Sequence, residues 1–173
     1  MDRFASPIGP IFVVADGVRI CAIDFGDEET RMMPLLRRRF GADVTTREAS
    51  DPCGACSALA AYFAGDLMAP AALSVEPGGT PFRRRVWAAL RDIPPGTTET
   101  YGGLAKQLGI PKSARAVGTA NGQNPIDIVI PCHRLVGADG SLTGYSGGLD
   151  RKRWLLAHEG ALAGEKRTPA LPF

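Results

Sequence analysis

The sequence predicts an α+β fold, with a small N-terminal antiparallel sheet and helices followed by a mainly helical C-terminal domain that contains a helix-turn-helix. Apolar residues and tight turns alternate over residues 2–25, as in antiparallel strands. From residue 80 onward, apolar residues recur at helical spacing between cap signals. Glu76-Pro77-Gly78-Gly79 separates the two parts as a linker. We therefore expect domains at residues 1–76 and 80–160 and a loosely ordered tail at 161–173.

The N-terminal elements follow from turn and cap residues. Strands at residues 11–15 and 18–25 are joined by a hairpin turn at Asp16-Gly17, after an earlier turn at residues 6–9. A helix is expected over residues 27–40, because Gly41 stops an apolar pattern there. Short strands are expected at 44–47 and 73–75. Asp51-Pro52 predicts an N-cap and a first-turn proline that open a helix to residue 64.

The C-terminal helices repeat these signals. Thr80-Pro81 opens a helix to residue 91, and Thr100 caps one of about eight residues. After a turn at Ile110-Pro111 comes a second short helix, residues 112–122, which gives a helix-turn-helix pattern. The last helix is expected over residues 151–159, with Asp150 as its cap.

Composition indicates a globular protein with an uneven charge. The chain has 173 residues, of which 45% are hydrophobic and 22% charged. No stretch reaches the roughly 18 apolar residues of a membrane span, and the N-terminus lacks the layout of a signal peptide. We expect a cytoplasmic monomer with reduced cysteines. Residues 80–173 hold 13 Lys and Arg against 7 Asp and Glu, which is typical of a domain with a polyanionic partner and equally of a merely solvated basic face.

A candidate nucleophile follows a short run of β-favouring apolar residues. Residues 126–130 predict a buried strand, and Pro131 ends it because proline has no N–H for the ladder. Cys132 and His133 come next and can cooperate only if the chain turns there, since neighbouring strand residues face opposite ways. The alternative is a small buried cysteine with no chemistry. The glycine-rich stretch 143–148 could bring backbone and Tyr145 close to a flat ligand.

Several separated blocks of this chain resemble one family. Ile130-Pro131-Cys132-His133-Arg134, with Asn124-Pro125 before it and Tyr145-Ser146-Gly147-Gly148 after it, is similar to the O6-alkylguanine-DNA alkyltransferases, also called methylated-DNA–protein-cysteine methyltransferases. The resemblance spans roughly residues 80–160. It also includes, in the usual order, Thr80-Pro81-Phe82, Tyr101-Gly102, Ala114-Arg115-Ala116-Val117-Gly118, Trp154-Leu155-Leu156 and Glu159.

The resemblance implies a function and a set of roles. The function is direct-reversal repair of double-stranded DNA, in which the alkyl group of a flipped-out O6-alkylguanine moves irreversibly to Cys132, with no cofactor and no metal. The catalytic residues implied are Cys132, His133, Glu159, Tyr101 and Asn124. The DNA-binding residues implied, in a minor-groove contact, are Arg115, Tyr101, Ala114, Ala116, Gly118 and Arg134. The substrate pocket implied consists of Tyr145, Ser146, Gly147, Leu135 and Pro131.

The same resemblance assigns finer roles. His133 acts as a base through a water and is oriented by Glu159, while Tyr101 donates towards guanine N3. Arg115 fills the gap left by the base. The carbonyls of Cys132 and Leu135 meet the exocyclic amine of guanine.

The chain also departs from the family pattern. Arg83 stands where glutamine is usual, and Gln123 where a basic residue is common. Neither change affects the chemistry. The zinc site of some members has no clear ligand set, because the only histidines are His133 and His158. His158 is expected to be a partly exposed residue of the last helical turn.

Two other functions remain open at this point. A non-catalytic protein that binds alkyl lesions and recruits other factors would share much of the pattern, although Cys132 argues against it. A redox-sensing regulator could be built on Cys53 and Cys56, since a Cys-x-x-Cys near a helix start can have a low thiol pKa.

Overall fold

The computed structural model describes residues 1–26 and 32–162, which form two compact units. The first contains Met1–Gly78 together with Pro125–Val129, and the second contains Gly79–Asn124 and residues 130–162. The α+β class predicted from the sequence is confirmed. No helix within the described ranges is long and apolar enough to cross a membrane.

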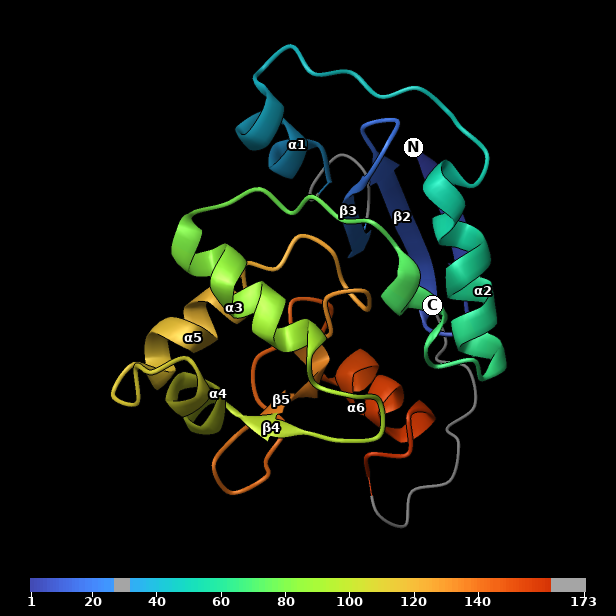
Figure 1. Cartoon of the computed structure of the whole chain (residues 1–173). Coiled ribbons are helices and arrows are strands. Elements are labelled where there is room, and N and C mark those ends of the chain that lie inside the picture. The colour runs from blue at the N-terminus through green and yellow to red at the C-terminus, as the bar shows by residue number, and fades with distance from the viewer. Residues whose placement is uncertain (27–31, 163–173) are drawn as a thin grey trace. The chain divides into compact units, whose positions relative to one another are not determined.

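The first unit is built on a three-stranded antiparallel sheet in the order β1-β2-β3, and Figure 1 labels its strands β2 and β3. Its strands are β1 (Asp2–Ser6), β2 (Gly9–Ala15) and β3 (Ile20–Phe25), as the turn residues predicted. Phe12, Val14 and Ala22 of this sheet form a buried cluster with Met32 and Leu36. Burying these apolar side chains stabilises the unit.

Two helices accompany this sheet. α1 (Met33–Phe40) has Pro34 in its first turn, while the start predicted for it at residues 27–31 lies outside the described residues. α2 (Ala55–Ala64) ends at Gly65 as expected. It begins later than predicted, because a 3-10 turn, η2 (Pro52–Gly54), intervenes. Asp51 still caps the helix from before that turn, since its carboxylate accepts from the backbone N–H of Cys56 over 2.7 Å.

Two short strands predicted for this unit are wrong. Residues 44–47 form no strand, because their backbone groups bond elsewhere. The N–H of Val44 donates to the Gly41 carbonyl, and the Arg47 carbonyl accepts from the Met1 ammonium. Residues 73–75 follow a 3-10 turn, η3 (Ala69–Ala72), and only Val75 makes a bridge, to Ile20.

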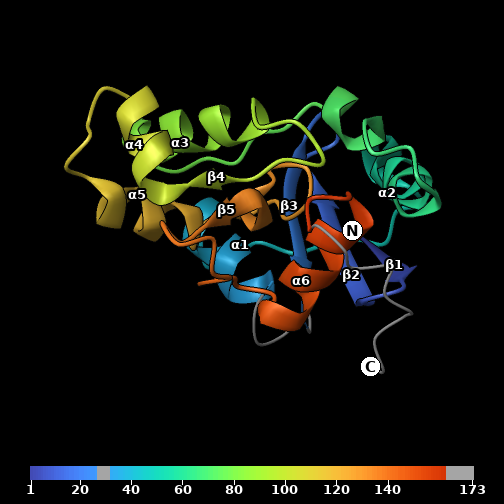
Figure 2. The same ribbon diagram turned by 90° about the horizontal axis from the view of Figure 1, so that it is seen from below.

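The second unit holds the remaining helices, which Figure 2 shows from below: α3 (Pro81–Arg91), α4 (Tyr101–Gln107), α5 (Ala114–Asn121) and α6 (Leu149–His158). A short parallel pair, β4 (Glu99–Thr100) and β5 (Leu135–Val136), lies among them. The predicted caps at Thr80 and Thr100 are confirmed, each hydroxyl accepting an N–H of the first turn. The cap predicted at Asp150 is wrong, because α6 already begins at Leu149 after Gly148.

α5 packs against both α3 and α4. The indole Nε1 of Trp87 in α3 donates to the Ala120 carbonyl over 2.8 Å, which ties these two helices together. Val117, Ala120 and Asn121 face the interior of the unit. Arg115 and Ala116 are exposed on another side of the same helix. α5 therefore presents a surface of small side chains with one long cation.

The strand predicted for residues 126–130 is wrong, although the segment is buried as expected. Only Ile126 makes a bridge, to Ile23 of β3. The N–H of Val129 then turns back to the Asp127 carbonyl over 2.8 Å, and Ile128 has a φ of 70°. A left-handed conformation costs an L-residue about 1–2 kcal/mol, more for a β-branched one, so this turn stores strain just before the candidate nucleophile.

Candidate active site around Cys132

Cys132 lies at the start of a tight turn, η4 (Cys132–Arg134). Pro131 precedes it with a φ of −80° and a ψ of 63°, and the N–H of Cys132 donates to the Ile130 carbonyl over 2.8 Å. The predicted turn at Pro131 is therefore present. It removes the strand alternation that would send neighbouring side chains to opposite faces.

Two asparagine amides hold the cysteine. Asn124 Nδ2 donates to the Ile130 carbonyl over 2.8 Å and to Cys132 Sγ over 3.0 Å. Asn121 Nδ2 donates to the Cys132 carbonyl over 3.2 Å. Both asparagines are buried, so these contacts are shielded from competing water. The resemblance implied Asn124 as a catalytic residue, whereas Asn121 had no predicted part.

His133 and Glu159 form a fully buried pair. His133 Nε2 lies 2.9 Å from Glu159 Oε1, which is the contact that the resemblance implied. Burial lowers the pKa of His133, although the carboxylate opposes this shift. Burial would raise the pKa of Glu159, but His133 and Arg134 outweigh it and hold that pKa far below its usual value. A neutral imidazole beside an ionised carboxylate donates from Nε2 and keeps Nδ1 as its acceptor.

The structure places Arg134, which the resemblance implied as a DNA-binding residue, in the interior of the unit. Its side chain is 6% exposed, and its guanidinium grips both oxygens of Glu159, with Nε 2.8 Å from Oε2 and Nη2 2.9 Å from Oε1. Nη1 donates to the Ile93 carbonyl over 2.6 Å. Three of the five N–H donors of this buried guanidinium are thus bonded within the protein. The physical reason is that a planar fork matches a carboxylate, which makes arginine the usual partner of a buried acid.

Tyr101 connects α4 to the glycine-rich stretch. Its hydroxyl donates to the Thr143 carbonyl over 3.1 Å, and burial raises the pKa of this phenol. A side chain at Gly118 or Gly144 would come into van der Waals contact with Tyr101. Tyr101 is therefore held as a protonated donor at the edge of the site.

Lys152 is a buried cation that the sequence reading missed. Its side chain is 0% exposed, and Nζ donates to the carbonyls of Leu135 over 2.5 Å and Thr143 over 2.6 Å. Burial lowers the pKa of Lys152 to about 8, while the nearby Cys132 opposes the shift. Lys152 lies between two arginines, a pattern typical of a solvated face. Its spacing to Leu155 and Leu156, three and four residues on, was the signal that could have placed it inside.

The remaining predicted site residues fall into groups by exposure. Of the pocket residues, Tyr145 and Ser146 are half-buried, and Pro131, Leu135 and Gly147 are buried. The Tyr145 ring meets His133 edge to face at 6.4 Å. On α5, Arg115 and Ala116 are exposed while Ala114 and Gly118 are half-buried. Cys132 itself is only 1% exposed, so an alkyl group reaches the sulfur only if the surrounding chain yields.

The expected partial exposure of His158 is wrong. The ring is 9% exposed and stacks on Trp154, with centroids 4.9 Å apart and planes 19° apart. Apolar packing along α6 explains the burial, because Trp154 lies one helical turn earlier on the same face.

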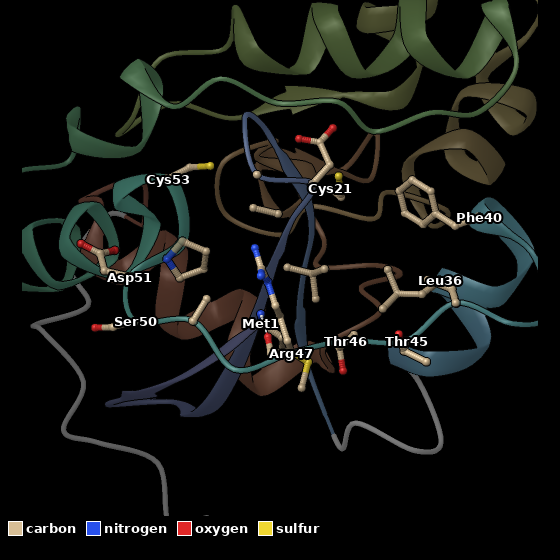
Figure 3. A pocket seen from close by; sticks show the side chains of 17 residues that line it. Met1, Cys21, Leu36, Phe40, Thr45, Thr46, Arg47, Ser50, Asp51 and Cys53 are labelled. Atoms are coloured by element: carbon tan, nitrogen blue, oxygen red, sulfur yellow. Dashed lines mark hydrogen bonds between the residues drawn. The ribbon is translucent and has the colours of Figure 1, made fainter.

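The first unit contains a cavity of about 570 Å³, which is shown in Figure 3. Cys21 and Cys53 are among its lining residues. Cys56 Sγ donates to the Asp2 carboxylate over 3.4 Å, and burial together with this carboxylate raises its pKa to about 12. A redox motif needs a thiol that ionises readily, which Cys56 does not supply. Within the described ranges, no group of three or more His, Cys, Asp or Glu side chains is placed to hold a metal ion.

Comparisons with known proteins match both units. Residues 81–161 match the family model of the DNA binding domain of 6-O-methylguanine DNA methyltransferase, and residues 3–76 match that of its ribonuclease-like domain. The methylated-DNA--protein-cysteine methyltransferase of Salmonella typhimurium is 50% identical, over 93% of this chain and 95% of the relative. The protein of the same name from Mycobacterium bovis is 54% identical, over 95% of this chain and 92% of the relative.

Solved structures agree with these matches. A crystal structure of Mycobacterium tuberculosis OGT in complex with DNA has a TM-score of 0.73 at 40% identity, and the match covers 97% of this chain and 94% of that one. An O6-methylguanine-DNA methyltransferase from Pyrococcus kodakaraensis has a TM-score of 0.68 at 30% identity, over 92% and 97% of the two chains. With both units matched and half of the residues identical to curated relatives, the chain belongs to the 6-O-methylguanine DNA methyltransferase family.

Proposed function

We propose that this protein repairs alkylated DNA by direct reversal, transferring the alkyl group of O6-alkylguanine to the sulfur of Cys132. The observation that carries the proposal is the hydrogen-bonded surroundings of that sulfur. Asn124 donates to it over 3.0 Å, and the buried His133–Glu159 pair stands next to it in the chain. A cysteine that only fills space needs neither a polar donor on its sulfur nor a buried acid–base pair.

The chemistry is a displacement at the alkyl carbon. A thiol of ordinary pKa, about 8.5, is only a few per cent ionised at neutral pH, so His133 first takes the proton of Cys132, through one water. The carbon–sulfur bond then forms as the carbon–oxygen bond to guanine O6 breaks, and the electron pair goes to the guanine. Tyr101 donates towards N3 as this charge develops. The buried Lys152 favours the thiolate by its positive charge.

Each protein molecule carries out a single transfer. The product is a thioether, which has no leaving group that water or another thiol readily displaces. The step needs only the protein thiol and the alkylated base, without a cofactor. We also propose a cytoplasmic location and a monomeric state, and the free Cys53 and Cys56 side chains suit a reducing compartment.

DNA binding is assigned to residues 80–160, with α4 and α5 as a helix-turn-helix in the minor groove. Double-stranded DNA hides the lesion in the base stack, so the guanine must rotate out at a cost of a few kcal/mol. The small exposed residues of α5 let its backbone approach the groove closely. Arg115 is exposed on this helix and would enter the gap in the stack, which offsets part of the cost.

Mass spectrometry tests the proposal directly. The intact protein is weighed before and after incubation with a duplex oligonucleotide containing one O6-methylguanine, and peptide mapping locates the added group. One methyl group on Cys132 is expected. Modification of Cys53 or Cys56 instead, or no mass change at full lesion excess, would show that the proposal is wrong.

Cys132→Ala separates repair from mere lesion binding. We expect this variant to bind the methylated duplex with unchanged affinity and to leave its methyl group in place. A wild-type protein that binds the lesion tightly yet gains no mass would instead be a recruiting protein, the alternative class.

A further inference from the structure

The carboxylate of Glu159 has two partners, an imidazole and a guanidinium, where the resemblance implies only the imidazole. Its Oε1 accepts from both His133 Nε2 and Arg134 Nη2, each over 2.9 Å, and its Oε2 accepts from Arg134 Nε over 2.8 Å. All three side chains are buried. The third nitrogen of the guanidinium is held by the Ile93 carbonyl over 2.6 Å. The position of Arg134 is thus fixed on both sides.

The guanidinium of Arg134 affects whether His133 is neutral or protonated. A buried carboxylate beside a lone imidazole would hold a proton on the ring, because an uncompensated charge in the interior is costly. An imidazolium cannot accept the proton of Cys132. Burial is the largest cause that lowers the pKa of His133, and Arg134 adds to it by compensating the charge of Glu159 and repelling a positive charge on the ring, so His133 stays neutral.

Resting on the proposed alkyl transfer, we infer that Arg134 is a positioning residue of this reaction, whose fork on Glu159 fixes the carboxylate and leaves His133 neutral as the acceptor of the Cys132 proton. After proton transfer the buried charges alternate in sign along Cys132, His133, Glu159 and Arg134. The guanidinium acts only through its neighbours and touches no part of the DNA.

The charged and titratable groups around His133 are few among the described residues. Glu159 and Lys152 come from α6 and its C-terminal end, and Cys132 and Arg134 from the same turn as the imidazole. The Tyr145 ring faces it edge-on. Of these, Glu159 favours the charged ring, whereas Arg134 and Lys152 oppose it.

The first test reads the proton on His133 without DNA. The chain has only two histidines, so ¹⁵N-histidine spectra with His158→Gln as the assignment variant identify both rings. Wild-type His133 should be neutral at pH 7, with the proton on Nε2. The pH of half-titration should rise in Arg134→Met, fall in Glu159→Gln and return towards wild type in the double variant. An imidazolium at pH 7 in the wild type, or no shift in Arg134→Met, would overturn the inference.

The second test follows single-turnover transfer from free O6-benzylguanine, which avoids effects on DNA binding. In Arg134→Met, the fall of the transfer rate on the acidic side of the pH–rate profile should begin at a higher pH. The rate should be about tenfold lower than that of wild type at pH 6.5 and equal to it near pH 8.5. Arg134→Lys keeps the charge without the fork, so its rate should fall equally at every pH. Arg153→Met, which removes an exposed cation from α6, is the matched control and should leave the limb unmoved. A pH-independent loss in Arg134→Met would mean that Arg134 is only structural.

The design remains decisive if Arg134→Met does not fold. The double variant with Glu159→Gln removes both buried charges and so avoids an unpaired carboxylate. Its His133 should titrate at higher pH than in Glu159→Gln alone, and an identical titration would refute the inference. Because the spectra need no lesion, they stand even if wild-type protein gains no methyl group, the result that would defeat only the proposed function.

Discussion

Asn124 donates from one amide nitrogen both to the sulfur of Cys132, over 3.0 Å, and to the carbonyl of Ile130, over 2.8 Å. The same side chain thus closes the turn that carries the cysteine and supplies a donor to the reacting atom. A hydrogen bond to a charged acceptor contributes about 1.5–3 kcal/mol, more than one to a neutral group. Asn124 should therefore favour the thiolate over the thiol.

Replacing this amide should slow the transfer without abolishing DNA binding. We expect Asn124→Leu to react about 10- to 100-fold more slowly than wild type, since the thiolate loses its donor. Asn124→Asp should be slower still, because its carboxylate repels a negative sulfur. Single-turnover rates with methylated duplex measure both variants. Equal rates for the Leu and Asp variants would show that Asn124 only braces the turn.

Tyr101→Phe removes one hydroxyl and keeps the ring between Gly118 and Gly144. The variant loses its hydrogen bond to Thr143 and its donor towards guanine N3. We expect the rate of methyl transfer to fall about a hundredfold, a typical effect of a lost proton donor. DNA affinity, measured by fluorescence anisotropy, should stay the same. A rate within twofold of wild type would contradict the donor role.

Arg115→Ala should matter only where a base has to leave the stack. Base flipping costs a few kcal/mol, so losing the inserted side chain should slow repair of duplex DNA about tenfold or more. Transfer from free O6-benzylguanine should be unchanged. Lys112→Ala, which removes an exposed cation just before α5, controls for the loss of charge alone. A similar loss on both substrates would exclude insertion into the gap.

The buried Lys152 should make stability rise with pH in the alkaline range. Its pKa is about 8 in the folded protein, below the ordinary value of 10.5, so the unfolded chain binds more protons between these values. Relative to Lys152→Met, the free energy of unfolding of wild type should increase by about 2 kcal/mol between pH 7.5 and 9.5. Urea unfolding at the two pH values measures this difference. If the stability difference between wild type and Lys152→Met is the same at both pH values, Lys152 is exposed to solvent.

Local signals in the sequence predicted much of the fold. The hairpin at Asp16-Gly17 and the caps at Thr80 and Thr100 depend on neighbouring residues alone, and the structure contains all three. The turn at Pro131 belongs to the same class, because the constraint is built into the proline ring. In each case the residue type itself restricts the backbone.

The errors occurred where distant residues decide the outcome. Arg134 and Lys152 look like solvated cations in the sequence, and only tertiary contacts show that they are buried. Residues 126–130 have the composition of a strand, yet Ile128 adopts a positive φ. A short apolar run cannot by itself distinguish a ladder from a buried turn. The surroundings of Cys132, which these residues form, were therefore less predictable from the sequence than the positions of the helices.

The assignment of Pro125–Val129 to the first unit affects how the protein can be shortened. The second unit is interrupted there, and Ile126 takes its bridge from Ile23. A fragment starting at Gly79 would contain the apolar segment Pro125–Val129 without β3, with which it pairs. This exposed segment would lie just before Pro131 and Cys132. Such a fragment should aggregate and transfer alkyl groups poorly, even though it includes every proposed catalytic side chain. Engineers seeking a minimal repair module would do better to keep the N-terminal sheet.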